Sequence, residues 1–154
     1  MNDSIDLSTE DMSQALAAKL ALYVASPLVL TFSGEIGAGK TTFIRALLRA
    51  LGVQSAVKSP TFSLVESYEA HGFFIHHFDL YRIHDETELE YIGFRDYFSN
   101  NTICCIEWPE HGAGYLSTVD IAFHLSPKGS GRILLATAYS HMGRRILNCL
   151  MGDK

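Results

Sequence analysis

Residues 34–41 form a glycine-rich segment that constrains the possible folds more than any other part of the chain. The segment reads G-E-I-G-A-G-K-T and matches the phosphate-loop pattern G-x-x-x-x-G-K-[ST] at every fixed position. Glycines let the backbone direct successive N–H groups at one anion, and a helix that follows adds the positive end of its dipole. The pattern therefore requires a strand before the loop and a helix after it.

The hydrophobic pattern predicts both flanking elements. Residues 28–32 read L-V-L-T-F, which is typical of a buried strand. A helix is expected from about Thr41, and Gly52 is a natural stop for it. One face of this helix carries the apolar residues Ile44, Leu47, Leu48 and Leu51. The motif thus lies in the strand–loop–helix context that its chemistry needs.

The remaining pattern predicts further strands and helices around this unit. An upstream helix is expected to end at Pro27, and Asp85 with Glu88 resembles a capping box that opens a short helix. The predicted helices cover Leu16 to Val24, residues 86–91 and residues 144–150, and the predicted strands cover residues 62–68, 73–78, 102–106, 119–125 and 132–138. The last two strands predict an antiparallel hairpin at a sheet edge, with a loop at 126–131. Together these elements predict an α/β layered structure with a mixed sheet, and the 154 residues correspond to about one domain, residues 1–154.

The charge of the chain argues against one class of partner. Lys and Arg number 12 against 17 Asp and Glu, which gives a formal net charge of -5. Binding to duplex DNA depends on a basic surface that displaces phosphate counterions. DNA is therefore not an expected partner, whereas a local contact with RNA stays open.

The sequence predicts a cytoplasmic protein with no membrane partner. The apolar stretch at residues 15–32 is interrupted by Lys19, Ser26 and Pro27, and the first eleven residues carry four acidic and no basic side chains, the reverse of a signal peptide. The three cysteines form no C-x-x-C pair, and Cys104 and Cys105 lie in an apolar run. Buried thiols in a reducing compartment are therefore expected.

Four residues are candidates for phosphate and metal chemistry. Lys40 is expected to reach the β and γ phosphates of a nucleotide, and the hydroxyl of Thr41 is expected to ligate Mg²⁺. Hydrolysis also needs a carboxylate near the metal and a group that positions water. Glu107 and Asp79 each end an apolar strand, and open α/β sheets bind ligands at the carboxyl ends of their strands. The alternative is that both are surface carboxylates.

Other candidates have two interpretations each. Thr61, which follows a Ser-Pro pair, either contacts the metal or γ-phosphate and reports the nucleotide state, or belongs to a turn that leads into a strand. Trp108 is either core packing or a wall of the site. Arg82 either supplies positive charge near the phosphates or pairs with an acidic neighbour. His76 and His77 face opposite sides of a strand, so we expect structural roles and no zinc site.

Four motifs together resemble a known family. They are G-E-I-G-A-G-K-T-T at 34–42, K-S-P-T-F at 58–62, H-F-D-L-Y-R at 77–82 and I-E-W-P at 106–109. In this order and spacing they resemble the TsaE (formerly YjeE) family of small bacterial ATPases in tRNA threonylcarbamoyladenosine synthesis. The phosphate loop is generic, whereas the last two motifs are more particular to that family. The resemblance covers about residues 28–114.

The resemblance implies a fold and an activity. The fold would be a P-loop NTPase-like three-layer α/β fold with a mixed central β-sheet. The activity would be slow hydrolysis of ATP with Mg²⁺, in support of the TsaB and TsaD proteins that modify position 37 of tRNA. The tRNA would then be an indirect partner, reached through that complex.

The resemblance also implies roles for individual residues. Thr41 and Glu107 resemble the Mg²⁺ ligands, while Thr61 and Asp79 resemble the switch and catalytic positions. The residues that resemble the nucleotide-binding set are Gly37, Ala38, Gly39, Lys40, Thr41, Thr42, Trp108, Glu10 and Arg132.

Two other functions stay open. In a nucleotide-gated binding switch, the state of residues 59–61 would control a partner and hydrolysis would be incidental. A small-molecule kinase would use the same loop, but it usually needs an arginine-bearing lid, and no arginine-rich segment of that kind is present. A GTP switch is disfavoured because the base-reading motifs N-K-x-D and T-K-x-D are absent.

Overall fold

One mixed sheet organises the protein. The structure is a computed structural model that describes residues 2–57, 60 and 63–152. Within these residues the strands pair in the order β1-β7-β6-β2-β5-β4-β3. The strands are β1 (Asn2–Leu7), β2 (Leu28–Ser33), β3 (Val65–Ala70), β4 (Phe73–Asp79), β5 (Thr102–Glu107), β6 (Ile121–Lys128) and β7 (Gly131–Ala138).

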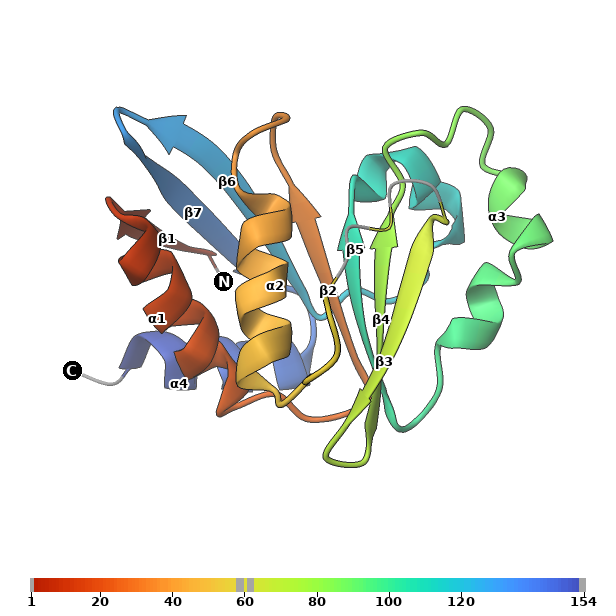
Figure 1. Cartoon of the computed structure of the whole chain (residues 1–154), viewed down its shortest axis with the longest axis horizontal. Helices are drawn as coiled ribbons and strands as arrows, with labels where there is room; N and C mark the ends of the chain where they lie inside the picture. The colour runs from red at the N-terminus through yellow and green to blue at the C-terminus, as the bar shows by residue number, and fades with distance from the viewer. Residues whose placement is uncertain (1, 58–59, 61–62, 153–154) are drawn as a thin grey trace.

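Helices cover the two faces of the sheet (Figure 1). The helices α1 (Glu10–Ala21), α2 (Lys40–Ala50) and α4 (His141–Gly152) contribute side chains to one buried cluster with β2, β6 and β7. A second buried cluster joins β4 and β5 to the short helix α3 (Glu88–Tyr91) and the 3-10 helix η1 (Phe94–Tyr97). This layered arrangement confirms the predicted α/β class with a mixed sheet.

The parallel part of the sheet places the phosphate loop. β2 pairs in parallel with both β5 and β6, and β4 pairs in parallel with β5. The carboxyl ends of these strands therefore lie at one edge, where the loop leaves β2 and enters α2. In the register, Glu107 at the end of β5 stands between Phe32 on β2 and Asp79 on β4. Asp79 and Glu107, each predicted to end an apolar strand, are direct neighbours in this register.

The hairpin of β6 and β7 is not at the sheet edge, so that prediction is wrong. β1 pairs antiparallel with β7 on one side, and β6 pairs with β2 on the other. Ile5 and Leu7 are the apolar residues of β1, and Leu7 is buried. Two apolar positions in six residues give a weak strand signal, so tertiary pairing decides the conformation here.

Other elements have shifted boundaries. α1 ends at Ala21 rather than at Pro27, and β3 runs over Val65–Ala70 rather than 62–68, of which residue 62 lies outside the described residues. β6 and β7 extend into the predicted loop at 126–131, and the predicted helix at 144–150 is the longer α4. The predicted capping contact forms, since Glu88 accepts hydrogen bonds from the N–H groups of His84 and Asp85, but α3 begins at Glu88 rather than at residue 86.

The adjacent cysteines of β5, Cys104 and Cys105, are confirmed as buried free thiols. Burial raises the pKa of Cys104 to about 12 and raises that of Cys105 as well. Both side chains therefore act as small apolar core residues. Among the helices of the described segments, none is long and apolar enough to span a bilayer.

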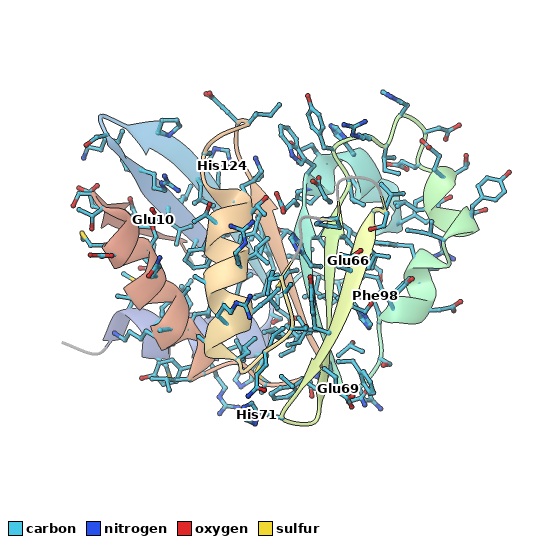
Figure 2. All side chains as sticks on the ribbon, viewed as in Figure 1. Glu10, Glu66, Glu69, His71, Phe98 and His124 are labelled. Atoms are coloured by element: carbon cyan, nitrogen blue, oxygen red, sulfur yellow. The ribbon has the colours of Figure 1, made fainter. Side chains whose placement is uncertain are left out.

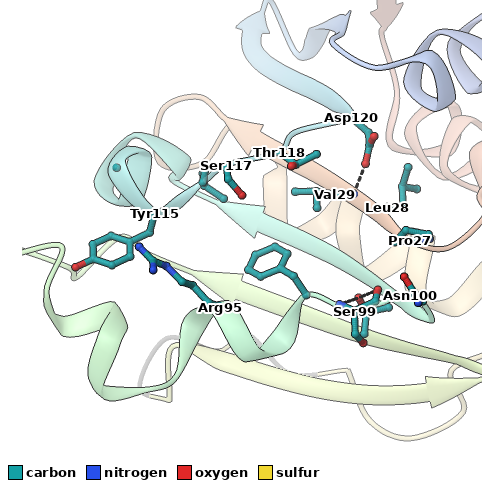
Figure 3. A pocket seen from close by; sticks show the side chains of 14 residues that line it. Pro27, Leu28, Val29, Arg95, Ser99, Asn100, Tyr115, Ser117, Thr118 and Asp120 are labelled. Carbon is teal, nitrogen blue, oxygen red and sulfur yellow. Dashed lines mark hydrogen bonds between the residues drawn. The ribbon is translucent and has the colours of Figure 1, made fainter.

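Asp120 ties the start of β2 to the start of α4. Its Oδ2 accepts the backbone N–H of Val29 at 2.8 Å (Figure 3), and its Oδ1 accepts the hydroxyl of Ser140 at 2.5 Å. Ser140 in turn accepts the N–H of Gly143 in the first turn of α4. The start of α4, which lies ahead of the predicted residues 144–150, is thus stabilised by a buried carboxylate.

Asp120→Ala is expected to lower the free energy of unfolding by about 1.5–3 kcal/mol, the range for hydrogen bonds to charged groups. The substitution leaves the buried N–H of Val29 without its acceptor. Urea unfolding at neutral pH measures the loss. Glu69→Ala, at an exposed position on β3, is the control and should stay within about 0.5 kcal/mol of wild type. Equal stability of the two variants would contradict the role of Asp120.

Candidate functional site

The loop at residues 34–41 has the backbone conformation that its sequence predicts. Gly34, Gly37 and Gly39 have φ values of 134°, 84° and 97°, which side chains other than glycine rarely adopt. A Cβ atom on Gly34 would overlap the backbone carbonyl of Leu125. These glycines let the loop turn tightly from β2 into α2.

The N-terminus of α2 is open for an anion. Gly39 occupies the N-cap in a left-handed conformation and has no side chain to cap the helix, and the first turn has no acidic residue. The first N–H groups of α2 and the positive end of its dipole are therefore not neutralised by a carboxylate of the helix's own first turn. This is the arrangement that binds phosphate in proteins.

Lys40 lies buried across the loop. Its ammonium donates hydrogen bonds to the carbonyl oxygens of Gly34 at 2.5 Å and Glu35 at 2.9 Å. The same atom lies 4.3 Å from the ring centroid of Trp108. Burial lowers the pKa of Lys40, and the carboxylates of Glu107 and Asp79 oppose that shift. The lysine is thus a desolvated cation next to the open end of α2.

Thr41 and Glu107 bring a hydroxyl and a carboxylate together beside the loop. The hydroxyl of Thr41 lies 3.0 Å from both carboxylate oxygens of Glu107, which is only 2% exposed. Mg²⁺ prefers oxygen ligands and is usually held by one or two protein groups together with phosphate oxygens and water. The donor set therefore suits the predicted metal ligands, Thr41 and Glu107.

Asp79 lies beside this pair. Burial raises the pKa of its carboxyl group, while the N–H of Tyr81, which donates to Oδ1 at 3.1 Å, acts in the opposite direction. The nearby Glu107 carboxylate adds to the upward shift. Asp79 is thus a partly buried carboxylate at the edge of the sheet where the loop opens, as predicted.

Asp79→Asn is expected to stabilise the protein at neutral pH. A carboxyl group whose pKa is raised on folding stabilises the fold below its ordinary pKa, and the contribution is lost as the pH rises through the raised value. The amide mimics the protonated form, so its advantage should be present at neutral pH and vanish below about pH 3.9. Urea unfolding across this pH range measures the difference. Asp96→Asn, at an exposed position, is the control for removing one charge, and a pH-independent difference would contradict the expectation.

Trp108 closes one side of the site. It follows β5 with φ 56° and ψ 53°, a conformation that is unusual for a bulky residue, and it precedes the 3-10 helix η2 (Pro109–Tyr115). Its ring lies 4.9 Å from that of Tyr81 and 5.6 Å from that of His111. Of its two predicted interpretations, the contact with Lys40 favours a wall of the site.

The remaining predicted nucleotide-binding residues lie around the loop. The guanidinium group of Arg132 on β7 lies against Gly39, where any Cβ atom would collide with it. Glu10 at the start of α1, labelled in Figure 2, lines a hollow between α1 and α2 together with Thr42 and Arg45. Gly37 and Ala38 belong to the loop itself, whereas Thr61 lies outside the described residues.

A second hollow, of about 620 Å³, lies toward the amino ends of the parallel strands (Figure 3). Pro27, Phe98 and Leu116 are among the residues that line it, and Arg95 lies over the ring of Tyr115 at 5.3 Å. Its buried carboxylate, Asp120, already has hydrogen-bond partners on both oxygens. We assign no ligand to this hollow.

One member of the site, His77, was not predicted from the sequence as a partner of Glu107. Nε2 of His77 lies 2.6 Å from Oε2 of Glu107, and both side chains are buried. The strand alternation contained the signal, because His77 and Asp79 stand two residues apart and so share a face of β4. The prediction that His76 and His77 face opposite sides is confirmed, since His76 contacts Ser67 and Tyr97 instead.

Known proteins with similar sequences identify the family of the chain. The family model described as "Threonylcarbamoyl adenosine biosynthesis protein TsaE" matches residues 7–134. The chain is 42% identical over 129 residues to the tRNA threonylcarbamoyladenosine biosynthesis protein TsaE of Haemophilus influenzae, covering 84% of this chain and 82% of the relative. It is 41% identical over 106 residues to the protein of the same name from Aquifex aeolicus, covering 68% and 74%.

The fold also has a solved counterpart. The crystal structure of YdiB from Bacillus subtilis superposes with a TM-score of 0.83, at 22% identity, and covers 97% of this chain and 94% of that one. At this identity the likeness concerns the fold. The family match extends over most of the chain and includes the phosphate loop, Asp79, Glu107 and Trp108. The chain therefore belongs to the TsaE family of threonylcarbamoyl adenosine biosynthesis proteins.

Proposed function

We propose that this chain is a Mg²⁺-dependent ATPase that supports formation of N6-threonylcarbamoyladenosine at position 37 of tRNA. Membership of the TsaE family links the chain to tRNA threonylcarbamoyladenosine biosynthesis. The single observation that carries the ATPase proposal is the hydrogen bond of Thr41 to Glu107, next to Lys40 and the open end of α2. The residues that would hold a phosphate and those that would hold a metal ion therefore lie side by side.

The residues around the loop divide the chemistry between them. Lys40 and the N–H groups of the loop stabilise the negative charge that spreads over the phosphate oxygens during in-line attack by water. Thr41 and Glu107 would hold Mg²⁺, which neutralises charge on the phosphates when bound. Asp79, beside Glu107 in the register, orients the attacking water or the water shell of the metal. Trp108 limits access of bulk water from its side.

The proposal includes partners and a compartment. The chain would act in the cytoplasm with TsaB and TsaD, and it would reach tRNA through that complex. Arginine groups supplied by a partner raise the turnover of phosphate-loop proteins by about 10³–10⁵-fold, so low activity of the isolated chain is compatible with the proposal. Arg82, exposed in the turn after β4, is a candidate for such a charge within the chain itself.

The decisive experiment measures phosphate release from ATP and Mg²⁺, for wild type and Lys40→Ala, with and without a TsaB–TsaD preparation. Release that rises with the partners and disappears with the substitution is the expected result. Tight ATP binding without release in either setting would replace the proposal with a nucleotide-gated binding switch. Transfer of the phosphate to an acceptor molecule would indicate a small-molecule kinase.

A further inference from the structure

His77 is a buried polar residue in contact with the proposed metal ligand. It lies on β4 and is 0% exposed, and its partner Glu107 on β5 is 2% exposed. The 2.6 Å distance between His77 Nε2 and Glu107 Oε2 is that of a short hydrogen bond. Two polar groups have thus been removed from water together, next to Thr41.

The direction of this hydrogen bond follows from the chemistry of the acceptor. An ionised carboxylate only accepts, so His77 donates through Nε2–H. Its other ring nitrogen, Nδ1, is buried and has no hydrogen-bond partner among the described residues. The imidazole therefore directs one hydrogen bond, and this bond goes to Glu107.

Burying Nδ1 of His77 without a hydrogen-bond partner destabilises the fold, and side-chain packing does not offset this loss. A buried polar atom without a partner costs about 1–3 kcal/mol, so an apolar side chain of similar size would fill the position more stably. The neighbour on the same strand differs. Nδ1 of His76 lies 2.7 Å from the hydroxyl of Ser67, on the opposite face, where the side chain is only half-buried. Of the two histidines, His77, which contacts Glu107, is therefore the one with a ring nitrogen that has no hydrogen-bond partner among the described residues.

We propose that His77 is a positioning residue that fixes the carboxylate of Glu107 for a divalent cation. Donation to Oε2 holds the plane of the carboxylate, and both carboxylate oxygens then lie 3.0 Å from the hydroxyl of Thr41. Groups that hold a metal ligand in this way commonly change metal affinity or activity by about 10–100-fold when they are removed. This inference rests on the proposed function, because it takes Glu107 as a ligand of Mg²⁺.

The test compares variants that keep or remove the donor. His77→Gln places an amide N–H near the position of Nε2, whereas His77→Leu and His77→Met fill the space without a donor. Met is flexible and adapts to the cavity if the leucine variant does not fold. His76→Leu on the opposite face of β4 is the matched control. Calorimetric titration with a non-hydrolysable ATP analogue, in EDTA and over a series of Mg²⁺ concentrations, gives the Mg²⁺ midpoint without relying on turnover.

We expect the apolar variants to bind the analogue in EDTA as wild type does, but to need about 10–100-fold more Mg²⁺ for the full gain in affinity. His77→Gln should recover most of that loss, and His76→Leu should behave as wild type. An unchanged Mg²⁺ midpoint in the apolar variants would overturn the inference while leaving the proposed function intact. So would a His77→Gln variant as impaired as the apolar ones, because packing would then explain the loss. Wild type that binds the analogue without any response to Mg²⁺ would overturn both.

Discussion

Lys40→Ala is expected to reduce ATP turnover by about 10²–10³-fold, equivalent to ~2.7–4 kcal/mol, the effect of removing one preorganised donor from a reacting anion. The ammonium of Lys40 lies beside the open N-terminus of α2. Among the described residues it donates hydrogen bonds to the carbonyl oxygens of Gly34 and Glu35, and it lies over the ring of Trp108. Phosphate oxygens are stronger acceptors than these carbonyls, and they carry the charge that grows in the transition state. Steady-state phosphate release at saturating ATP measures the loss.

The matched control for this substitution is Lys128→Ala. Lys128 lies at the end of β6 and forms an exposed ion pair with Asp6 at 3.4 Å, an interaction that contributes little in water. It should change turnover less than twofold, within about 0.4 kcal/mol of barrier. If Lys40→Ala kept turnover within tenfold of wild type while remaining folded, the loop would not stabilise the transferred phosphate and the ATPase proposal would be wrong.

The parallel core of the fold could be predicted from the sequence because its signals are local and strong. The run at residues 28–32 and the one at 102–106 are almost wholly apolar, as strands buried on both faces require. The glycines of the loop select a backbone conformation directly. Parallel strands bring their carboxyl ends to the same edge of the sheet, so Asp79 and Glu107 could be placed at strand ends near the loop, whereas their direct pairing needed the strand order.

The edges of the sheet could not be predicted in the same way. β1 has polar residues at most positions and is held by backbone pairing with β7, a contact between segments more than 120 residues apart. Local patterning carries little information about such pairing. The end of α1 was misplaced for a related reason, because Tyr23 and Val24 continue the helical spacing but pack against the core from an irregular segment.

The candidate site shows the same division. Residues of the loop follow from the motif, whereas the short contacts around them depend on the three-dimensional register. The hydrogen bond between His77 and Glu107 joins neighbouring strands, and the contact of Arg132 with Gly39 joins β7 to the loop. Both contacts depend on the strand order, which local hydrophobic patterns and short motifs do not reveal.

Glu107→Ala is expected to lower turnover by well over tenfold, more than ~1.4 kcal/mol of barrier, and Asp79→Ala is expected to do the same for a different reason. Loss of Glu107 removes the proposed oxygen ligand of Mg²⁺, leaves His77 without its acceptor and frees the hydroxyl of Thr41. The Mg²⁺ concentration for half-maximal turnover should therefore rise. Loss of Asp79 leaves the contact of Thr41 with Glu107 intact, so if Asp79 orients the attacking water, the maximal rate should fall at an unchanged Mg²⁺ requirement.

Phosphate release as a function of Mg²⁺ concentration separates these two outcomes. Glu69→Ala, at the exposed end of β3, is the control for removing a carboxylate from a strand and should leave both the rate and the Mg²⁺ requirement unchanged. Unchanged turnover in Glu107→Ala and Asp79→Ala alike would mean that neither carboxylate takes part in hydrolysis. A fall in rate with the same Mg²⁺ requirement in both variants would instead mean that Glu107 positions water and does not bind the metal. The strand order supports different roles for the two carboxylates, because Glu107 lies next to the strand that carries the loop and Asp79 lies one strand further away.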